Sequence, residues 1–174
     1  LSDFFLKKNF FVRSIDNLIY NQKKPTKKKN FRFNNFNISK IDKIRNFINE
    51  NSIIILLAGL VGDPITKKYP RISKKINENY IIKLIDCCFK KKVKHIIFVS
   101  TCSNYGITNS NKMVNEKSKL NPLSLYAKSK IKIEKNLEKK SKKNTIKTTI
   151  LRFATAFGIS ERMRFDLTVN QFVR

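Results

Sequence analysis

The sequence predicts an α/β fold built on a doubly wound parallel sheet. Continuous apolar runs that have the composition of buried strands alternate along the chain with amphipathic, helix-like segments. The apolar run 96–99 ends abruptly in Ser100 and Thr101, which is typical of a strand that delivers polar groups to its carboxyl end, where ligands bind in open α/β sheets. The 174 residues suffice for one domain with a hydrophobic core.

The first sixty residues are expected to contain three strands. These lie over 10–15, 31–38 and 52–57, with helical segments over 1–9 and 41–50 and a Lys- and Asn-rich loop over 20–30. The first strand ends in Asp16, an acid where a dinucleotide site accepts hydrogen bonds from a ribose, although a turn uses Asp equally well. The third is followed by Gly59 and Gly62, which would let a ligand approach the backbone or would serve an ordinary strand-to-helix turn.

The second part continues the same alternation. We expect a helix over 71–91, a strand over 96–101, a loop over 107–120, a helix over 122–143 and a strand over 145–153. The predicted apolar stripe of the first helix consists of Ile72, Ile76, Tyr80, Leu84 and Cys88. The second helix is expected to begin with Asn121 as its cap and Pro122 in its first turn.

A hydroxyl, a phenol and a cation form the candidate catalytic group. Thr101 ends the strand over 96–101, and Tyr126 and Lys130 are four residues apart on the next helix, so they share one face. Such a group can move a proton on and off a sugar or alcohol hydroxyl. The Tyr-to-Lys spacing alone is weak evidence in a Lys-rich chain, since Tyr20 and Lys24 have it within a loop. It gains weight because Thr101, Asp16 and the glycines all fall at strand ends on one predicted edge.

The charge is strongly positive, with 38 Lys and Arg against 12 Asp and Glu and a net charge of +26. This charge suggests nucleic-acid binding. However, Lys is spread through every segment and the aromatic residues lie in apolar strand-like runs, which favours a general compositional bias instead. We therefore expect no nucleic-acid partner.

Other compositional features limit the classes of function. His95 is the single histidine and the three cysteines lack ligand spacing, so neither a metal site nor a His-based catalytic triad is expected. No apolar run is long enough to span a bilayer, and the first residues do not form a secretory signal, so a cytoplasmic location is expected.

Several motifs together resemble a known family. They are SIDNL, LLAGLVGDP, the helix containing Asn77, FVSTCSNYG, NPLSLYAKSK, LRFATAFG and RMRFDLTVN. As a set, they resemble the extended short-chain dehydrogenase/reductase family, in particular its NAD-dependent epimerase/dehydratase branch of UDP-glucose 4-epimerase-like enzymes. The resemblance covers almost the whole chain and implies a Rossmann-like fold, NAD as cofactor and a nucleotide sugar as substrate. It also implies a possible homodimer, paired through the helices over 71–91 and 122–143.

The resemblance implies a catalytic role for the three residues already singled out. Tyr126 would be the general acid and base, and Thr101 would hydrogen-bond the reacting sugar oxygen. Lys130 would hold the nicotinamide ribose and lower the pKa of Tyr126, whose ordinary value of about 10 is too high for work near neutral pH.

Further residues correspond to the family's binding positions. Those for the cofactor are Asp16, Asn17, Asn37, Ile38, Leu57, Ala58 and Gly59, and those for the substrate are Thr155, Arg164 and Asn170, with Arg162 beside them. Asn37 stands where the family usually has Asp, and Thr155 where many epimerases have Asn. Asp16 favours NAD over NADP. An NADP site would need an arginine near Asp16 to hold the 2′-phosphate, and Arg13 is expected to point off the other end of the strand over 10–15. An NADP-dependent reductase is therefore the weaker alternative.

One departure concerns completeness. The family's glycine-rich phosphate loop lies about 20 residues before the ribose acid, which would place it and the first strand before Leu1. We therefore expect residues 1–174 to be a partial NAD(P)-binding Rossmann domain, truncated at both ends, with the substrate lobe beginning at about 160–174. As it stands, this chain is expected to bind NAD poorly.

Another departure bears on the reaction. Cys102 and Ser103 stand where the family's dehydratases carry an acidic pair, and elimination needs such an extra acid or base. An epimerase is therefore the leading expectation, a sugar reductase or synthase the second and a dehydratase the third. A basic RNA-associated protein with a Rossmann shell and a non-functional gene product that does not fold are the alternatives outside enzymes.

Overall fold

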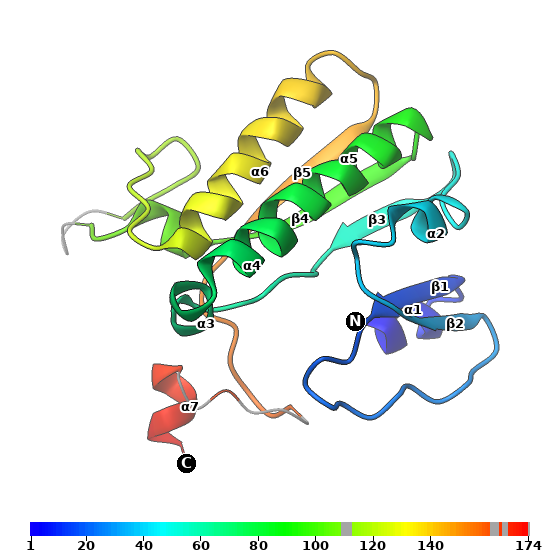
Figure 1. Ribbon diagram of the computed structural model, residues 1–174, viewed down its shortest axis with the longest axis horizontal. Coiled ribbons are helices and arrows are strands. Elements are labelled where there is room, and N and C mark those ends of the chain that lie inside the picture. Colours follow the sequence, from blue (N-terminus) through cyan, green and yellow to red (C-terminus); the bar gives the residue numbers. More distant parts are fainter. Residues whose placement is uncertain (109–112, 161–163, 165–166, 174) are drawn as a thin grey trace. The chain divides into compact units, whose positions relative to one another are not determined.

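The computed structural model describes residues 1–108, 113–160, 164 and 167–173. The chain divides into two compact units (Figure 1). Unit 1 comprises Leu1–Lys40 and Phe157–Arg174, and unit 2 comprises Ile41–Ala156. We describe each unit by itself.

Unit 2 is built on a three-stranded parallel sheet with the order β3-β4-β5. Its strands are β3 (Ile53–Leu56), β4 (His95–Thr101) and β5 (Lys147–Phe153). Helix α2 (Ile41–Arg45) precedes β3, and α3 (Asp63–Lys68), α4 (Pro70–Lys74), the π-helical turn η1 (Lys75–Tyr80) and α5 (Ile81–Lys90) connect β3 to β4. The 3-10 turn η2 (Cys102–Tyr105) and helix α6 (Leu125–Ser141) connect β4 to β5.

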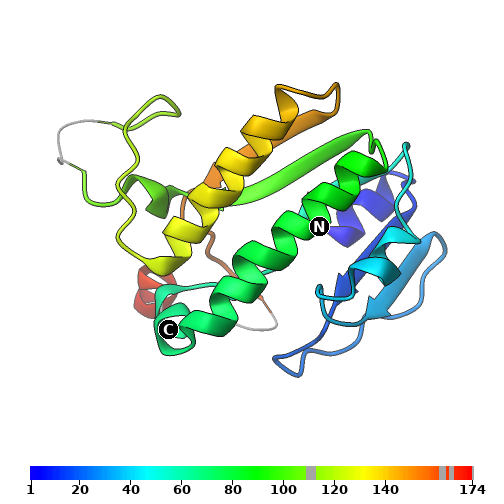
Figure 2. The same ribbon diagram turned by 45° about the horizontal axis from the view of Figure 1, so that its top comes forward.

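The core of unit 2 lies between the sheet and two helices. Helices α5 and α6 lie side by side on one face of the sheet (Figure 2). Ile96 and Phe98 of β4 are almost fully buried, as are Ile85 of α5 and Ile133 and Leu137 of α6. Burial of these large apolar side chains supplies the main stabilisation of the unit.

Unit 1 contains a two-stranded parallel sheet of β1 (Val12–Asp16) and β2 (Phe31–Asn35). Helix α1 (Ser2–Lys7) packs beside β1 and is linked to it by the Ser2 and Ser14 hydroxyls, 3.0 Å apart. The short helix α7 (Thr168–Phe172) also belongs to this unit. The five described strands of the two units pair only in parallel, which confirms the predicted α/β class.

The predicted helix over 71–91 is not a continuous α-helix, because η1 interrupts it. A π-helical turn holds one more residue than an α-helical turn and therefore shifts the face that each residue presents. Ile72 is consequently 52% exposed, whereas Ser73 and Asn77 are buried. The predicted stripe was wrong before this turn and right after it, where Leu84 and Cys88 are buried.

The predicted start of the next helix was also wrong. Ser124 is the N-cap of α6, and its hydroxyl accepts a hydrogen bond of 3.1 Å from the backbone N–H of Ala127. Asn121 lies before the helix because its own backbone N–H donates to the carbonyl oxygen of Asn104 at 3.0 Å. Tertiary pairing of this backbone group therefore outweighed the local preference for an Asn-Pro helix start.

Among the described residues, no helix combines the length and the apolar character that crossing a membrane requires.

Candidate active site

Thr101 ends β4 and begins the turn η2. Its hydroxyl oxygen accepts a hydrogen bond of 3.1 Å from the backbone N–H of Ser103, so it caps this turn. The same hydroxyl donates to the Ser103 hydroxyl at 3.2 Å. The end of the strand thus places two hydroxyl groups together at the carboxyl edge of the sheet.

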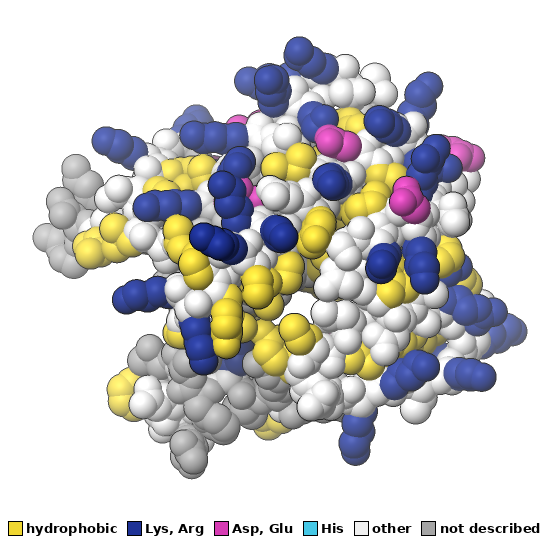
Figure 3. Space-filling view, in the orientation of Figure 1, with side chains coloured by type: hydrophobic (Ala, Val, Ile, Leu, Met, Phe, Trp, Pro, Cys, Tyr) yellow, Lys and Arg dark blue, Asp and Glu magenta, His cyan; other side chains and the backbone are white. Residues whose placement is uncertain are grey.

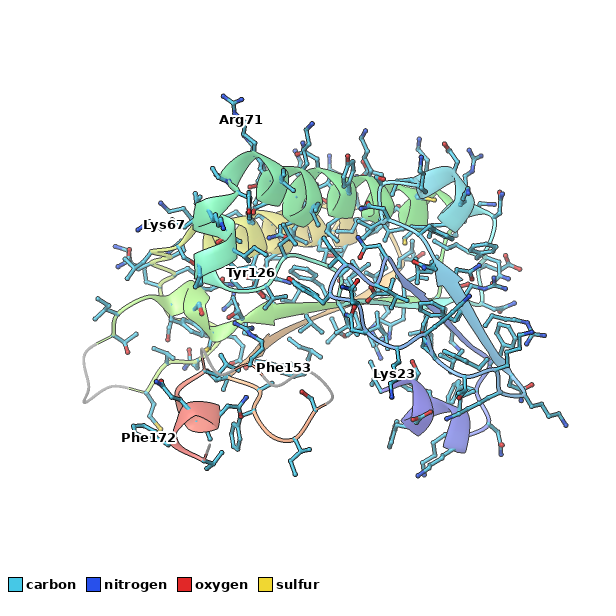
Figure 4. All side chains as sticks on the ribbon, turned by 60° about the horizontal axis from the view of Figure 1, so that its bottom comes forward. Lys23, Lys67, Arg71, Tyr126, Phe153 and Phe172 are labelled. Atoms are coloured by element: carbon cyan, nitrogen blue, oxygen red, sulfur yellow. The ribbon has the colours of Figure 1, made fainter. Side chains whose placement is uncertain are left out.

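Tyr126 and Lys130 lie in the first turns of α6, which pack against the end of β4 (Figure 4). The Lys130 ammonium group donates to the carbonyl oxygen of Val99 at 2.8 Å, two residues before Thr101. It lies 5.5 Å from the centre of the Tyr126 ring and 4.7 Å from that of Phe98. The structure therefore places the cation beside the phenol, as the spacing of four residues predicts.

The environment of Lys130 disfavours its charged form. Its residue is only 7% exposed, and this burial lowers the pKa of Lys130 from 10.5 to about 8, an effect that the carboxylate of Glu134 partly opposes. Aromatic faces and a backbone carbonyl stabilise the ammonium that remains. The protonation of Lys130 thus depends on its burial and on the Glu134 carboxylate.

The loop after β3 is held by the side chain of Asn77, to which we assigned no role from the sequence. The Asn77 side chain of η1 accepts from the backbone N–H of Leu60 at 2.8 Å and donates to its carbonyl oxygen at 2.9 Å. A Cβ atom at Gly59 would lie 3.0 Å from the Asn77 side-chain oxygen, so a side chain there would disturb this contact. The residues Leu57 and Ala58 just before it are exposed.

The next residue of η1 ties this segment to α6. The carboxylate of Glu78 accepts from the Ser129 hydroxyl at 3.1 Å and from the Lys132 ammonium group at 2.6 Å. Glu78 and Asn77 are both buried. No local pattern indicated their burial, because Asn77 and Glu78 lie in the largely polar run 71–79, where an amide and an acid are expected to be exposed.

The candidate ribose and adenine residues lie in unit 1, at the carboxyl ends of its two strands. Asp16 accepts from the backbone N–H of Leu18 at 2.7 Å, and Asn17 accepts from that of Ile19 at 3.3 Å. After β2, the side chain of Asn37 accepts from the backbone N–H of Ser39 at 2.8 Å. The turn role that we considered for Asp16 is therefore present, and each of the three residues stabilises a local turn.

The candidate substrate residues divide between the units. Thr155 is an exposed residue of unit 2. In unit 1, the side chain of Asn170 is buried, where it accepts from the Gly158 N–H at 3.2 Å and donates to the Arg164 carbonyl oxygen at 3.1 Å. Arg162 lies outside the described residues.

The structure thus forms two clusters of candidate residues, one in each unit. Unit 2 brings Tyr126 and Lys130 to the end of β4, where Thr101 lies. In unit 1, Asp16 at the end of β1 pairs with Asn35 at the end of β2; Asn17 follows the first strand, and Asn37 and Ile38 follow the second. No group of three or more potential metal ligands occurs among the residues that the structure describes.

A comparison with protein families identifies the chain. A model of the NAD dependent epimerase/dehydratase family matches residues 1–173. The chain belongs to this family. Its members depend on NAD, so the chain belongs to a family of enzymes whose cofactor is NAD.

Individual relatives agree with this assignment. Protein CapI of Staphylococcus aureus is 28% identical over 133 residues, which are 75% of this chain and 40% of CapI. The UDP-glucuronic acid 4-epimerase of Bacillus cereus, solved with NAD, is 24% identical with a TM-score of 0.80, covering 99% of this chain and 56% of that one. The UDP-Glc/GlcNAc 4-epimerase of Campylobacter jejuni is 26% identical with a TM-score of 0.74, covering 85% and 47%. These likenesses confirm the Rossmann-like fold, and the chain spans about half the length of the structures that it matches.

Proposed function

We propose that this chain contributes part of the NAD-binding domain and the acid–base group of a nucleotide-sugar 4-epimerase. The supporting observation is the placement of a buried Lys130 beside Tyr126 at the end of β4, where Thr101 supplies a hydroxyl. The structural relatives from Bacillus cereus and Campylobacter jejuni are 4-epimerases of UDP-sugars, which makes a UDP-sugar the proposed substrate class. In this proposal residues from about 160 onward begin the substrate lobe.

The residues of the proposed site have distinct tasks. The Tyr126 phenolate takes the proton from the hydroxyl of the sugar carbon that reacts, and returns it at the end of the cycle. The Lys130 ammonium group stabilises the phenolate by its charge, while its bond to the Val99 carbonyl fixes its position. Thr101 donates its hydroxyl hydrogen bond to the sugar oxygen in place of the Ser103 hydroxyl. NAD, when bound, supplies the acceptor and then the donor of the hydride.

The residues present fit an NAD cofactor in part. Asp16 offers a carboxylate at the end of β1, as an adenosine ribose requires, and Asn37 and Ile38 follow the neighbouring strand β2. In unit 2, the loop of Leu57, Ala58 and Gly59 follows the partly exposed strand β3. Gly59 has no side chain, which leaves room for the Asn77 side chain beside it. We propose that, within unit 2, this loop and Lys130 contact NAD, with Lys130 at the nicotinamide ribose.

The turn after Thr101 supports epimerisation over elimination. Cys102 and Ser103 offer no carboxylate, whereas loss of water from a sugar needs a further acid or base there. The positive charge does not favour RNA binding as an alternative function. Lys and Arg side chains are scattered over the face shown in Figure 3 and do not gather on one element.

The proposal is tested in the protein that carries this chain, incubated with NAD and with UDP-glucose, UDP-N-acetylglucosamine or UDP-glucuronic acid. We expect the 4-epimer of one of them, detected by NMR of the sugar. Tyr126→Phe should reduce turnover by about 10²- to 10⁴-fold while NAD affinity, measured by calorimetry, is retained. The matched control Tyr69→Phe changes an exposed tyrosine and should leave turnover unaltered.

Other outcomes would decide against this proposal. Full turnover in Tyr126→Phe would exclude the phenol as the acid–base group. Stoichiometric consumption of NADH with a reduced sugar as product would identify a reductase. If the protein shows no turnover and binds RNA with the same affinity in Tyr126→Phe and Tyr69→Phe, it is an RNA-binding protein and not an epimerase.

We also propose that the protein pairs as a homodimer through α5 and α6, whose parallel placement on one sheet face resembles half of a helical bundle (Figure 2). Sedimentation equilibrium tests this, and a monomer at all concentrations would contradict it.

A further inference from the structure

The carboxylate of Glu134 is the most heavily hydrogen-bonded acid that the structure describes. Its residue is 1% exposed, one helical turn beyond Lys130 on α6. The Ser100 hydroxyl donates to it at 2.5 Å and the Asn104 amide at 2.8 Å. The Arg152 guanidinium adds a two-pronged contact, with its closest N···O distance at 2.7 Å. A buried carboxylate with this many donors is held in one position.

These donors come from three elements of unit 2, namely β4, η2 and β5. Ser100 is the residue before Thr101 on β4, Asn104 belongs to the turn η2 that Thr101 caps, and Arg152 belongs to β5. Arg152 extends the network, since it also donates to the Tyr105 hydroxyl at 3.2 Å. We call the end of β4 and the turn η2, residues 100–105, the Thr101 corner. The Glu134 side chain therefore attaches the Thr101 corner to α6, the helix that carries Tyr126 and Lys130.

The charge of Glu134 also acts on Lys130. Burial lowers the pKa of Lys130 to about 8, and the Glu134 carboxylate is the charge that opposes this effect. Other ionisable groups on the surrounding elements include Tyr126 on α6, Tyr105 on η2, Arg152 on β5 and Glu78 on η1. Hydrogen bonding to Glu134 raises the pKa of Arg152, so this guanidinium stays charged. Within this group, Glu134 is the acid four residues from Lys130 on the same helix face.

We propose that Glu134 is the positioning residue of this site: it fixes the Thr101 corner on α6 and keeps the neighbouring Lys130 in its ammonium form. The inference rests on the proposed function for the roles of Thr101 and Lys130. Its test does not use turnover, so that its failure and the failure of the proposed function can be distinguished.

The experiment measures the titration of Lys130 in the 174-residue chain by NMR of ¹³Cε-labelled lysine. The Lys130 signal is assigned by its loss in Lys130→Arg. In Glu134→Gln, which keeps the size of the side chain and removes its charge, we expect the pKa of Lys130 to fall by about one unit. Glu138→Gln makes the same change one turn later, at an exposed position of α6, and should leave the titration unchanged.

The direction of the change separates this role from a purely structural one. Unfolding would release Lys130 to water and raise its pKa towards 10.5, so a loss of structure cannot produce the expected fall. An unchanged pKa in folded Glu134→Gln would overturn the proposal.

A second variant covers the case in which Glu134→Gln does not fold because Arg152 is left buried and unpaired. Glu134→Gln combined with Arg152→Met removes the pair as a unit, which proteins tolerate better than the loss of one partner. The pKa of Lys130 should fall in this variant also, by less than in Glu134→Gln, because the positive charge of Arg152 is removed together with the carboxylate. An unchanged or increased value in the folded double variant would overturn the inference.

Discussion

The hydrogen bonds between Asn77 and Leu60 predict a large loss of stability in Asn77→Ala. Both residues are buried, and the substitution leaves the N–H and the carbonyl oxygen of Leu60 without their 2.8 and 2.9 Å partners. Each unsatisfied buried group costs about 1–3 kcal/mol, and water that enters the vacated space recovers part of it. We therefore expect the free energy of unfolding to decrease by about 2–4 kcal/mol.

The assay is urea unfolding of the 174-residue chain, followed by far-ultraviolet circular dichroism. With a slope of about 2 kcal/mol per molar urea, the midpoint should fall by about 1–2 M. Asn79→Ala is the matched control, because Asn79 is exposed in the same π-helical turn, and it should change stability by less than about 0.5 kcal/mol.

A second substitution tests the direction of the two bonds. In Asn77→Asp, the carboxylate still accepts from the Leu60 N–H but repels the Leu60 carbonyl oxygen, so the loss at pH 7 should resemble that of Asn77→Ala. Acidification protonates the carboxyl group and restores a donor, so this variant should recover stability relative to Asn77→Ala as the pH falls. A decrease of less than about 1 kcal/mol in Asn77→Ala would refute the reasoning, because the loop would then not depend on this side chain.

Three further predictions concern the same unit. Gly106→Ala should destabilise the chain by about 2 kcal/mol or more in urea unfolding, because Gly106 has φ +68° and a Cβ there would collide with the Asn121 carbonyl; a loss below about 0.5 kcal/mol would contradict this. Burial lowers the pKa of Lys130 from 10.5 to about 8. At pH values between these two, Lys130 therefore binds a proton when the chain unfolds. The wild-type chain should therefore gain stability relative to Lys130→Met as the pH rises through this window, by up to about 1.4 kcal/mol per pH unit, and parallel pH profiles would disprove it. A thiol reagent at pH 8 should modify the partly exposed Cys102 first, because burial raises the pKa of Cys88 to about 12; equal rates for these two thiols would be the contrary result.

The sequence predicted the features that depend on local periodicity. The strands followed from short apolar runs bounded by polar residues, and the placement of Lys130 beside Tyr126 followed from the pitch of an α-helix. The family motifs are distributed over nearly the whole chain, so the residues alone were enough to indicate the resemblance, and the family comparison confirmed it.

The remaining features depend on contacts between segments that are distant in the sequence. Asn77 holds a residue 17 positions before it, and Ser100 and Glu134 are 34 residues apart. Such bonds leave no periodic signal. The π-helical turn η1 was missed for the same reason, since the loop and the helix that its side chains bind determine which residues face inward. Helix propensity alone predicts a regular helix through this segment.

The strand order has a consequence for how the isolated chain behaves in solution. Within the part of the chain that the structure describes, β1 and β3 each pair with a strand on one side only. The N–H and carbonyl groups along such an edge can pair with a strand of another molecule, and Ile53 of β3 adds an apolar surface that is 46% exposed. The net charge of +26 keeps molecules apart, but 0.1 M salt screens this repulsion at separations beyond about 10 Å. Ionic strength should therefore control whether concentrated samples stay dispersed or aggregate edge to edge.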